Sequence, residues 1–338
     1  MTLSPVIIFN YNRPDHSFRT WEALSRNQFA SETELYLYCD GPKLTSERMN
    51  ELTNERISES NARVEQTQTL AKQYAIDAPK VGKFKAVHVV CAEKNKGLAN
   101  SIIGGVTEVI NKHGRAIILE DDLLTSPFFL KYMNEALEFY DRRKSVFTIS
   151  ANRIPVTKMS IPNDYQYDVF VSLRPLSTGW ATWLDRWEQV DWSLDYLPSL
   201  LNHPEQLEAM NRAGSDMQQM LLLQREGKID SWAIRYCYSH FYNHAIAILP
   251  CVPYVDNIGF DGSGTHSGTN EKDYHNDVSL ACENPRFLDV LYEDKRIINE
   301  FYSFCSSTKR PFYQRVINTI FRKLGKPAPY VLKSKVYE

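Results

Sequence analysis

The stretch Ile117-Ile118-Leu119-Glu120-Asp121-Asp122 sets three consecutive carboxylates directly after a short apolar run. The run from Ala116 to Leu119 has the length and composition of a buried strand, and strands disfavour Asp. We therefore place the acidic residues at the carboxyl end of a strand, where open α/β sheets bind their ligands. The alternative is that Asp121 or Asp122 only caps the next helix, although Ser126-Pro127 already offers a cap.

Apolar runs and helical patterns alternate around this stretch through the first 150 residues. An apolar helical stripe from Leu98 to Ile110 precedes it and ends at Gly114, and a second stripe from Phe129 to Tyr140 follows. This alternation predicts an α/β fold, with a mostly parallel sheet flanked by helices. The predicted strands are Val6–Phe9, Leu35–Cys39, Ala86–Cys91, Ala116–Leu119 and Val146–Ile149.

The sequence changes character after residue 150. Residues 151–200 are rich in Pro, Trp and Asp, which predicts loops and short elements around a site. We expect a helix at His203–Glu226, a strand at Ile246–Val252 and a loop in the Gly-rich stretch Asn257–Asn270. Earlier in the chain, the polar stretch Thr45–Ala75 predicts a helical excursion on the surface.

The composition excludes several classes of protein. A net charge of -2 over 338 residues gives no general attraction to nucleic acid. The six cysteines form no C-x-x-C pair, which argues against zinc ribbons, and Cys39 and Cys91 end apolar runs as expected of buried free thiols. Without a signal peptide or an apolar run of about 18 residues, a cytoplasmic location with reduced thiols is expected.

The acidic stretch and three other segments resemble motifs of a known protein family. Leu119-Glu120-Asp121-Asp122-Leu123 resembles the acidic metal-binding motif of GT-A glycosyltransferases. Its Glu-Asp-Asp form is that of the N-acetylglucosaminyltransferase that initiates complex N-glycans, and of related bacterial polysaccharide transferases. Three segments that precede it stand in the order of this family: Pro5–Pro14, Asp40-Gly41 and Glu93–Ala99. The resemblance implies a GT-A, Rossmann-like fold, and it covers roughly residues 5–270.

On the donor side, the resemblance implies a nucleotide diphosphate sugar held together with Mn²⁺ or Mg²⁺. Asp122 would be the direct metal ligand, while Glu120 and Asp121 would orient the ribose and the hydrated metal. His266 would complete the metal's ligand shell or contact the diphosphate. The other residues implied to bind the nucleotide or donor are Asn10, Asn12, Arg13, Asp40, Asn95 and Gly97.

On the acceptor side, Gly179-Trp180 resembles the loop that lines donor and acceptor in these enzymes. A glycine lets backbone approach a sugar closely, and Trp offers a face for stacking. Asp230, in Ile229-Asp230-Ser231-Trp232, resembles the catalytic base of inverting members, but it follows Ile where the family has an acid. Asp185 and Asp191 are competing candidates, and Asp230 as a helix N-cap is the structural alternative.

The resemblance predicts a nucleotide-sugar-binding half at residues 1–150, an acceptor-binding, catalytic half at 151–284 and a helical basic tail at 285–338. Basic and apolar residues interleave between Lys309 and Lys326, which fits either a helix docked on the protein or a peripheral contact with an anionic membrane. The expected acceptor is a glycan or a lipid-linked glycan.

The predicted function is therefore transfer of a sugar, with inversion, in bacterial surface polysaccharide synthesis. UDP-sugars are the expected donors, with UDP-GlcNAc first because of the Glu-Asp-Asp form. A sugar nucleotidyltransferase is an alternative, but Asn10–Pro14 lacks the Gly-rich basic loop that it needs after the first strand. A non-catalytic module that binds sugar nucleotides or glycans is another alternative, and transfer with retention also stays open.

Overall fold

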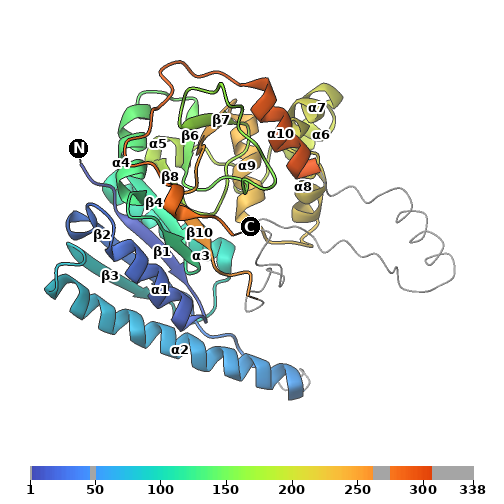
Figure 1. Cartoon of the computed structure of the whole chain (residues 1–338). Coiled ribbons are helices and arrows are strands. Elements are labelled where there is room, and N and C mark those ends of the chain that lie inside the picture. The colour runs from blue at the N-terminus through green and yellow to red at the C-terminus, as the bar shows by residue number, and fades with distance from the viewer. Residues whose placement is uncertain (1, 46–50, 262–274, 307–338) are drawn as a thin grey trace.

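One eight-stranded sheet organises the chain (Figure 1), whose structure, a computed structural model, describes residues 2–45, 51–261 and 275–306. Across the sheet the strands are β3 (Ala86–Cys91), β2 (Glu34–Cys39), β1 (Val6–Asn10), β4 (Arg115–Glu120), β8 (Trp180–Trp183), β6 (Val146–Ser150), β9 (Ile246–Pro250) and β7 (Val169–Ser172). The first four strands are mutually parallel, as are β6 and β9, whereas β8 and β7 run antiparallel to their neighbours. The five strands predicted before residue 150 are all confirmed, and strands from both sides of that residue share the sheet.

Helices cover both faces of the sheet, so that the fold is a Rossmann-like α/β arrangement, as predicted. α1 (Pro14–Ser25), α2 (Glu51–Lys80) and α4 (Phe129–Tyr140) pack into one apolar cluster with one face. α3 (Leu98–His113), α5 (Leu184–Trp187) and α9 (Trp232–Tyr242) pack against the other face. Because both faces are covered, the central strands read as continuous apolar runs.

The polar stretch predicted as a surface excursion has a structural role. α2 lies along the β3 end of the sheet (Figure 1) and buries Val64, Ala71, Tyr74 and Ala78. Its apolar positions are widely spaced because only a narrow stripe of this long helix faces the strands. The excursion is thus part of the cover of the sheet.

The acidic stretch does not lead into a helix. Asp121 and Asp122 form a turn, and the chain continues as β5 (Leu123–Thr125), which pairs antiparallel with β10 (Val255–Asn257). α4 begins only at Phe129, so the predicted cap at Ser126-Pro127 is wrong by two residues. The alternative that Asp121 or Asp122 caps the following helix is therefore excluded.

The second half of the chain contains shorter elements than expected. The helix predicted at His203–Glu226 is two helices, α7 (Pro204–Asn211) and α8 (Met217–Arg225), separated near Gly214, whose φ is 143°. Such a φ favours glycine and interrupts a helix. The remaining short elements are η1 (Ala30–Glu32), α6 (Leu197–Leu201) and η3 (Val278–Leu280).

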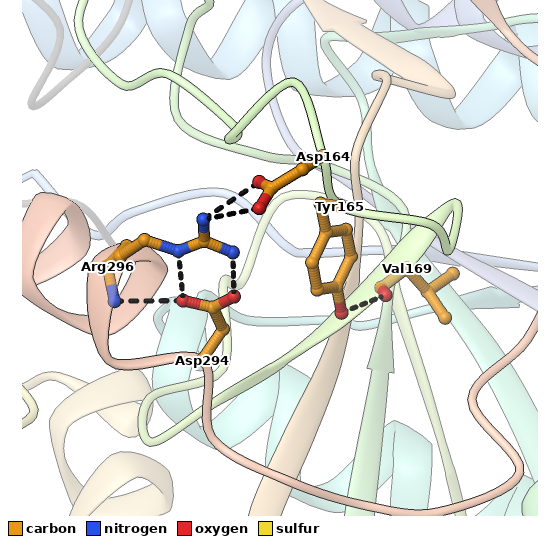
Figure 2. Close-up of polar contacts among 5 residues, drawn as sticks. All are labelled: Asp164, Tyr165, Val169, Asp294 and Arg296. Carbon is orange, nitrogen blue, oxygen red and sulfur yellow. Dashed lines mark hydrogen bonds and ion pairs between the residues drawn. The ribbon is translucent and has the colours of Figure 1, made fainter.

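α10 (Lys295–Ser306) is anchored at its first turn by charge. Figure 2 shows the Arg296 guanidinium between two carboxylates: Nη1 lies 2.8 Å from Asp164 Oδ1, and Nη2 lies 2.7 Å from Asp294 Oδ2. Further along the helix, Ile297 and Phe301 pack with Ile154, which follows β6. The predicted basic tail beyond residue 306 lies outside the described residues. Within the described ranges, no helix has the length and apolar character needed to cross a bilayer.

Candidate functional site

The carboxyl ends of β1, β2 and β4 meet at one edge of the sheet. In the parallel register Phe9 stands opposite Glu120, and Asn10 stands opposite Cys39. The residues that follow these strands are therefore neighbours, and they include the acidic motif, which we define as Glu120–Asp122. This is the edge at which parallel α/β sheets bind ligands.

Arg13 forms an ion pair with the last residue of the acidic motif. Its Nη1 lies 2.9 Å from Asp122 Oδ2, and the two side chains are only 16% and 14% exposed. Burial lowers the pKa of Arg13, but the charges of Asp121, Asp122 and Asp261 outweigh it and leave the pKa raised. The guanidinium is thus a permanent cation surrounded by carboxylates.

Asp121 is the most deeply buried residue of the acidic motif. Its Oδ2 accepts the Tyr11 backbone N–H at 3.2 Å, and its carbonyl accepts the Thr20 hydroxyl at 2.9 Å. Burial, followed by the charge of Asp122, raises the pKa of Asp121 to about 7. Nearby, the hydroxyl of Tyr11 is buried and has no hydrogen-bond partner among the described residues. Next to the acidic motif there is thus a buried hydroxyl group with which a ligand could form a hydrogen bond.

Asp40 ties together two loops at the same edge. Its carboxylate accepts hydrogen bonds from the backbone N–H groups of Gly41, Lys96 and Gly97 and from Asn95 Nδ2, at 2.8–3.0 Å. A Cβ on Gly41 would lie 2.5 Å from backbone carbon of Lys94, so only glycine fits this close approach. Asp40 and Asn95, both predicted to contact the nucleotide, are brought together, and the Asp40 carboxylate positions the loop from Lys94 to Gly97 at the start of α3.

Asn10 and Asn12 are also close to this edge but are engaged within the protein. Asn10 donates to the carbonyls of Ile8 and Tyr38 and accepts from Trp21 Nε1 at 3.1 Å. Asn12 donates to the hydroxyl of Ser60 on α2 at 2.6 Å. Asn10 therefore fixes the spacing of β1 and β2, and Asn12 connects the site to α2.

A pocket of about 80 Å³ lies beside the acidic motif. The segment after β10 separates the two: the Ile258 backbone N–H donates to the Asp122 carbonyl at 2.9 Å, and Asn257 and Phe260 line the pocket. A Cβ on Gly259 would lie 2.1 Å from Asp122 Oδ2. The backbone of this segment thus lies between the acidic motif and the pocket.

Trp180 lies at the pocket, and Gly179 directly precedes it at the start of β8. Gly179 has a φ of 74°, and a Cβ there would lie 3.2 Å from Val255 Cγ1. Trp180 lines the pocket and stacks on Trp232, with ring centroids 5.1 Å apart. Trp180 is only 1% exposed, so it belongs to the buried wall of the pocket and offers little surface to solvent.

Three asparagines, none of them predicted as a site residue, contribute to the polar lining of this pocket. Asn152 donates to the Thr178 hydroxyl at 2.8 Å and accepts from Asn276 Nδ2 at 2.9 Å, and Asn257 lines the pocket beside them. Asn152 carried a usable signal, because it follows the end of a predicted strand. Trp232 Nε1, also at the pocket, is buried without a partner among the described residues.

No Asp or Glu stands among the described residues that line the pocket. Asp230, the predicted base, is 63% exposed and pairs with Arg235 at 2.9 Å. Ser231, and not Asp230, caps α9, since its hydroxyl accepts the Ile234 N–H. Asp185 pairs with Lys144 and Arg186, and Asp191 accepts backbone N–H groups of its own turn. The structure does not bring any of the three carboxylates into the pocket wall.

The acidic motif offers the ligand chemistry of a hard divalent cation, which prefers carboxylate oxygens. Asp122 and Asp261 both lie close enough to Arg13 to raise its pKa, so that this position already attracts positive charge. Asp122 is the residue that would hold the ion, and Arg13 would have to yield its place. No cluster of three or more potential ligand side chains occurs in the described part of the chain, and His266 lies outside it.

Comparison with known proteins gives only distant likenesses. No protein-family model matches the sequence, and no curated protein matches it. The structure of S. aureus TarS aligns with 56% of this chain at 14% identity and a TM-score of 0.36, and this chain spans 30% of TarS. A UDP-glucose pyrophosphorylase in complex with UDP-glucose aligns with 73% of this chain and 90% of its own, at 10% identity and a TM-score of 0.34. Likenesses this weak do not show what activity the protein has.

Proposed function

We propose that this protein is a GT-A type glycosyltransferase, which transfers a sugar from a nucleotide diphosphate donor to a glycan or lipid-linked glycan. The observation that carries the proposal is the position of the acidic motif. It stands at the carboxyl end of the central strand β4, beside the loops that follow β1 and β2, and only one segment separates it from a pocket.

The charges at this edge suit a diphosphate bound with a cation. A nucleotide diphosphate brings negative charge that the buried carboxylates would repel, so positive charge must stand between them. Arg13 supplies one such charge, and Mn²⁺ or Mg²⁺ held by Asp122 would supply more by neutralising the leaving diphosphate. The N–H groups of Lys96 and Gly97 are bonded to Asp40, and the backbone N–H groups that follow them in the first turn of α3 add a further favourable field for phosphate.

The pocket suits the transferred sugar or the acceptor. Its neutral polar groups are side-chain amides and hydroxyls, which exchange hydrogen bonds with sugar hydroxyls, and Trp180 and Trp232 form part of its aromatic wall. The two arginines that line it are already engaged: Arg174 pairs with Asp216, and Arg153 donates to backbone carbonyls. The pocket therefore favours a neutral sugar over an acidic one.

Donor turnover tests the proposal. UDP-, GDP- and CDP-sugars, including UDP-GlcNAc, would be incubated with Mn²⁺ or EDTA, and nucleotide release would be measured for the wild type and Asp122→Asn. Asp15→Asn, an exposed carboxylate on α1, is the matched control. Slow, metal-dependent release from one donor, lost in Asp122→Asn and kept in Asp15→Asn, is the expected result.

The other outcomes also decide between functions. Tight binding of a donor without release, even with glycan acceptors present, would favour a non-catalytic binding module. If no sugar nucleotide binds, as judged by calorimetry, the proposal is wrong.

The role of Asp230 as the catalytic base of an inverting transfer is part of the same proposal. It requires the Asp230–Arg235 ion pair to open when the acceptor binds. Asp230→Asn should then lower kcat strongly and leave the donor KM unchanged, whereas Asp191→Asn should not. An unchanged kcat would remove Asp230 from the mechanism and leave two alternatives, a different base such as Asp185 and transfer with retention.

A further inference from the structure

Cys39 and Cys91 end the neighbouring strands β2 and β3, and they stand opposite each other in the parallel register. Both belong to the apolar cluster under α2, together with Leu37 and Val89, so the two thiols lie on the same face of the sheet. Neighbouring strands are about 4.8 Å apart. That spacing lies within the range of about 4.4–6.8 Å between the Cα atoms of disulfide-bonded cysteines.

The two thiols differ in exposure and acidity. Cys39 is 2% exposed, whereas Cys91 is partly open to solvent. A hydrogen bond from Cys39, helped by the charge of Lys72, lowers the pKa of Cys91 to about 7 against the opposing effect of burial. The same hydrogen bond, together with burial, raises the pKa of Cys39. Cys91 is thus an accessible thiol with thiolate character, and Cys39 is a protected thiol beside it.

We propose that Cys39 and Cys91 are an oxidative modification site, at which a peroxide drives reversible formation of a disulfide. The Cys91 thiolate attacks one oxygen of hydrogen peroxide and breaks the O–O bond, so that Cys91 becomes a sulfenic acid. The leaving hydroxide takes up a proton from solvent, which replaces the proton that the thiol lost, and forms one molecule of water. The Cys39 sulfur then displaces the hydroxyl group as a second molecule of water and closes the disulfide. Two thiols are oxidised and one peroxide is reduced, and a dithiol reductant reverses the change.

The pair lies at the base of the loops that Asp40 ties together. The Ala92 backbone N–H donates to the Cys39 carbonyl at 2.9 Å, and Gln68 on α2 donates to the carbonyls of Asp40 and Ala92 at 3.2 Å. A disulfide would link covalently the strand ends that are now linked by these hydrogen bonds. The chemistry of the pair does not depend on the proposed transferase activity.

The other cysteines provide the internal comparison. Burial raises the pKa of Cys251 to about 12 and that of Cys305 to about 11 and also raises that of Cys237, which disfavours their thiolates. Cys282 is partly exposed and lies outside the strands. The 338-residue chain contains six cysteines, and mass spectrometry can follow the oxidation state of each of them separately.

The test treats the reduced 338-residue chain with one equivalent of hydrogen peroxide and then alkylates the remaining thiols. The expected result is loss of two of the six alkylation sites, a mass lower by two hydrogen atoms before alkylation, and a cross-linked peptide joining Cys39 to Cys91. Dithiothreitol should restore all six sites. In Cys39→Ser, dimedone should trap a sulfenic acid on Cys91, whereas Cys282→Ser should form the same cross-link as the wild type.

Two results would overturn the proposal. The first is retention of all six thiols in the wild type at this dose, a result that requires no variant to fold. The second is a cross-link that joins other cysteines or two chains. Circular dichroism of Cys39→Ser would confirm that the variant is folded before its dimedone adduct is interpreted.

Discussion

Arg13 holds its Nη1 atom 2.9 Å from Oδ2 of Asp122, so the last residue of the acidic motif already has a cation as its partner. A divalent ion that binds Asp122 must compete with this guanidinium. Because both side chains are mostly buried, the competition has a measurable energy, although partial exposure weakens it. The positive charge of Arg13 also offsets the repulsion among the carboxylates at this edge when no ligand is bound.

Removal of the guanidinium should therefore strengthen metal binding in the absence of a donor. We expect Arg13→Gln to bind Mn²⁺ about fivefold more tightly, corresponding to about 1 kcal/mol, the upper end for a partly exposed ion pair. Titration calorimetry without nucleotide measures this. Arg19→Gln, on an exposed position of the same helix, should leave the affinity unchanged. Weaker binding in Arg13→Gln would mean that Asp122 is not the site of the ion.

Asp40 should be required for the order of the loop that it holds. Asp40→Asn replaces an acceptor oxygen with a donor group that faces backbone N–H groups of Lys96 or Gly97. The side chain is 8% exposed, so the mismatch should lower the free energy of unfolding by about 2 kcal/mol. Hydrogen exchange should accelerate at the amides of both residues.

Asp77→Asn, an exposed carboxylate on α2, is the matched control and should change neither quantity. An Asp40→Asn protein with unchanged exchange and weakened nucleotide binding would instead assign Asp40 to direct contact with the ligand.

Local sequence signals predicted well the edge of the sheet at which β1, β2 and β4 end. Short runs of apolar residues, β-branched or aromatic, marked β1 to β4, and the carboxylates after Leu119 marked the strand end, because both signals lie within a few consecutive residues. Pairing of β5 with β10 had no such signal, since it joins segments separated by more than a hundred residues of chain. Three-residue strands are also too short for a periodicity to be read.

Only part of the site could be predicted, because many of its contacts also join segments that are distant in the sequence. The sequence predicted that Arg13 and Asp122 share a site, but their direct ion pair depends on the turn after β1 and on the pairing of β5. Asn152 and Asn276 are 124 residues apart, and only the fold brings their amides together. Asn257 stands in a predicted loop, where its polarity carried no information about the pocket.

Two adjacent glycines on α3 should respond to alanine in opposite ways. A Cβ on Gly104 meets no atom within 4 Å, whereas a Cβ on Gly105 would lie 2.8 Å from the ring of Phe9. Gly104→Ala should raise the free energy of unfolding by about 0.5–1 kcal/mol, since alanine reduces the entropy of the unfolded chain. Gly105→Ala should lower it by about 1–3 kcal/mol through overpacking.

Chemical denaturation of the two variants measures both effects, and each variant serves as the control for the other. If both substitutions stabilise the protein, α3 does not pack as closely on β1 as described.

His240 should make the stability of the protein depend on pH in the acidic range. The ring is fully buried: Nδ1–H donates to the Tyr236 carbonyl at 2.9 Å, and Nε2 lies 2.8 Å from the Thr148 hydroxyl. Burial lowers the pKa of His240 from its ordinary value of 6.5 to about 4. Between these two values the unfolded chain binds a proton that the folded protein does not, so the free energy of unfolding falls as the pH falls.

The full loss from this one group is about 3 kcal/mol, reached as the pH falls through 4. His240→Gln removes the titrating group, so its free energy of unfolding should change less between pH 6.5 and pH 4 than that of the wild type. Denaturant titrations at a series of pH values measure the two slopes. His244→Asn, at an exposed position with a φ of 53° that Asn tolerates, should keep the wild-type slope. Equal slopes in all three proteins would show that His240 takes up its proton without unfolding and that its pocket admits water.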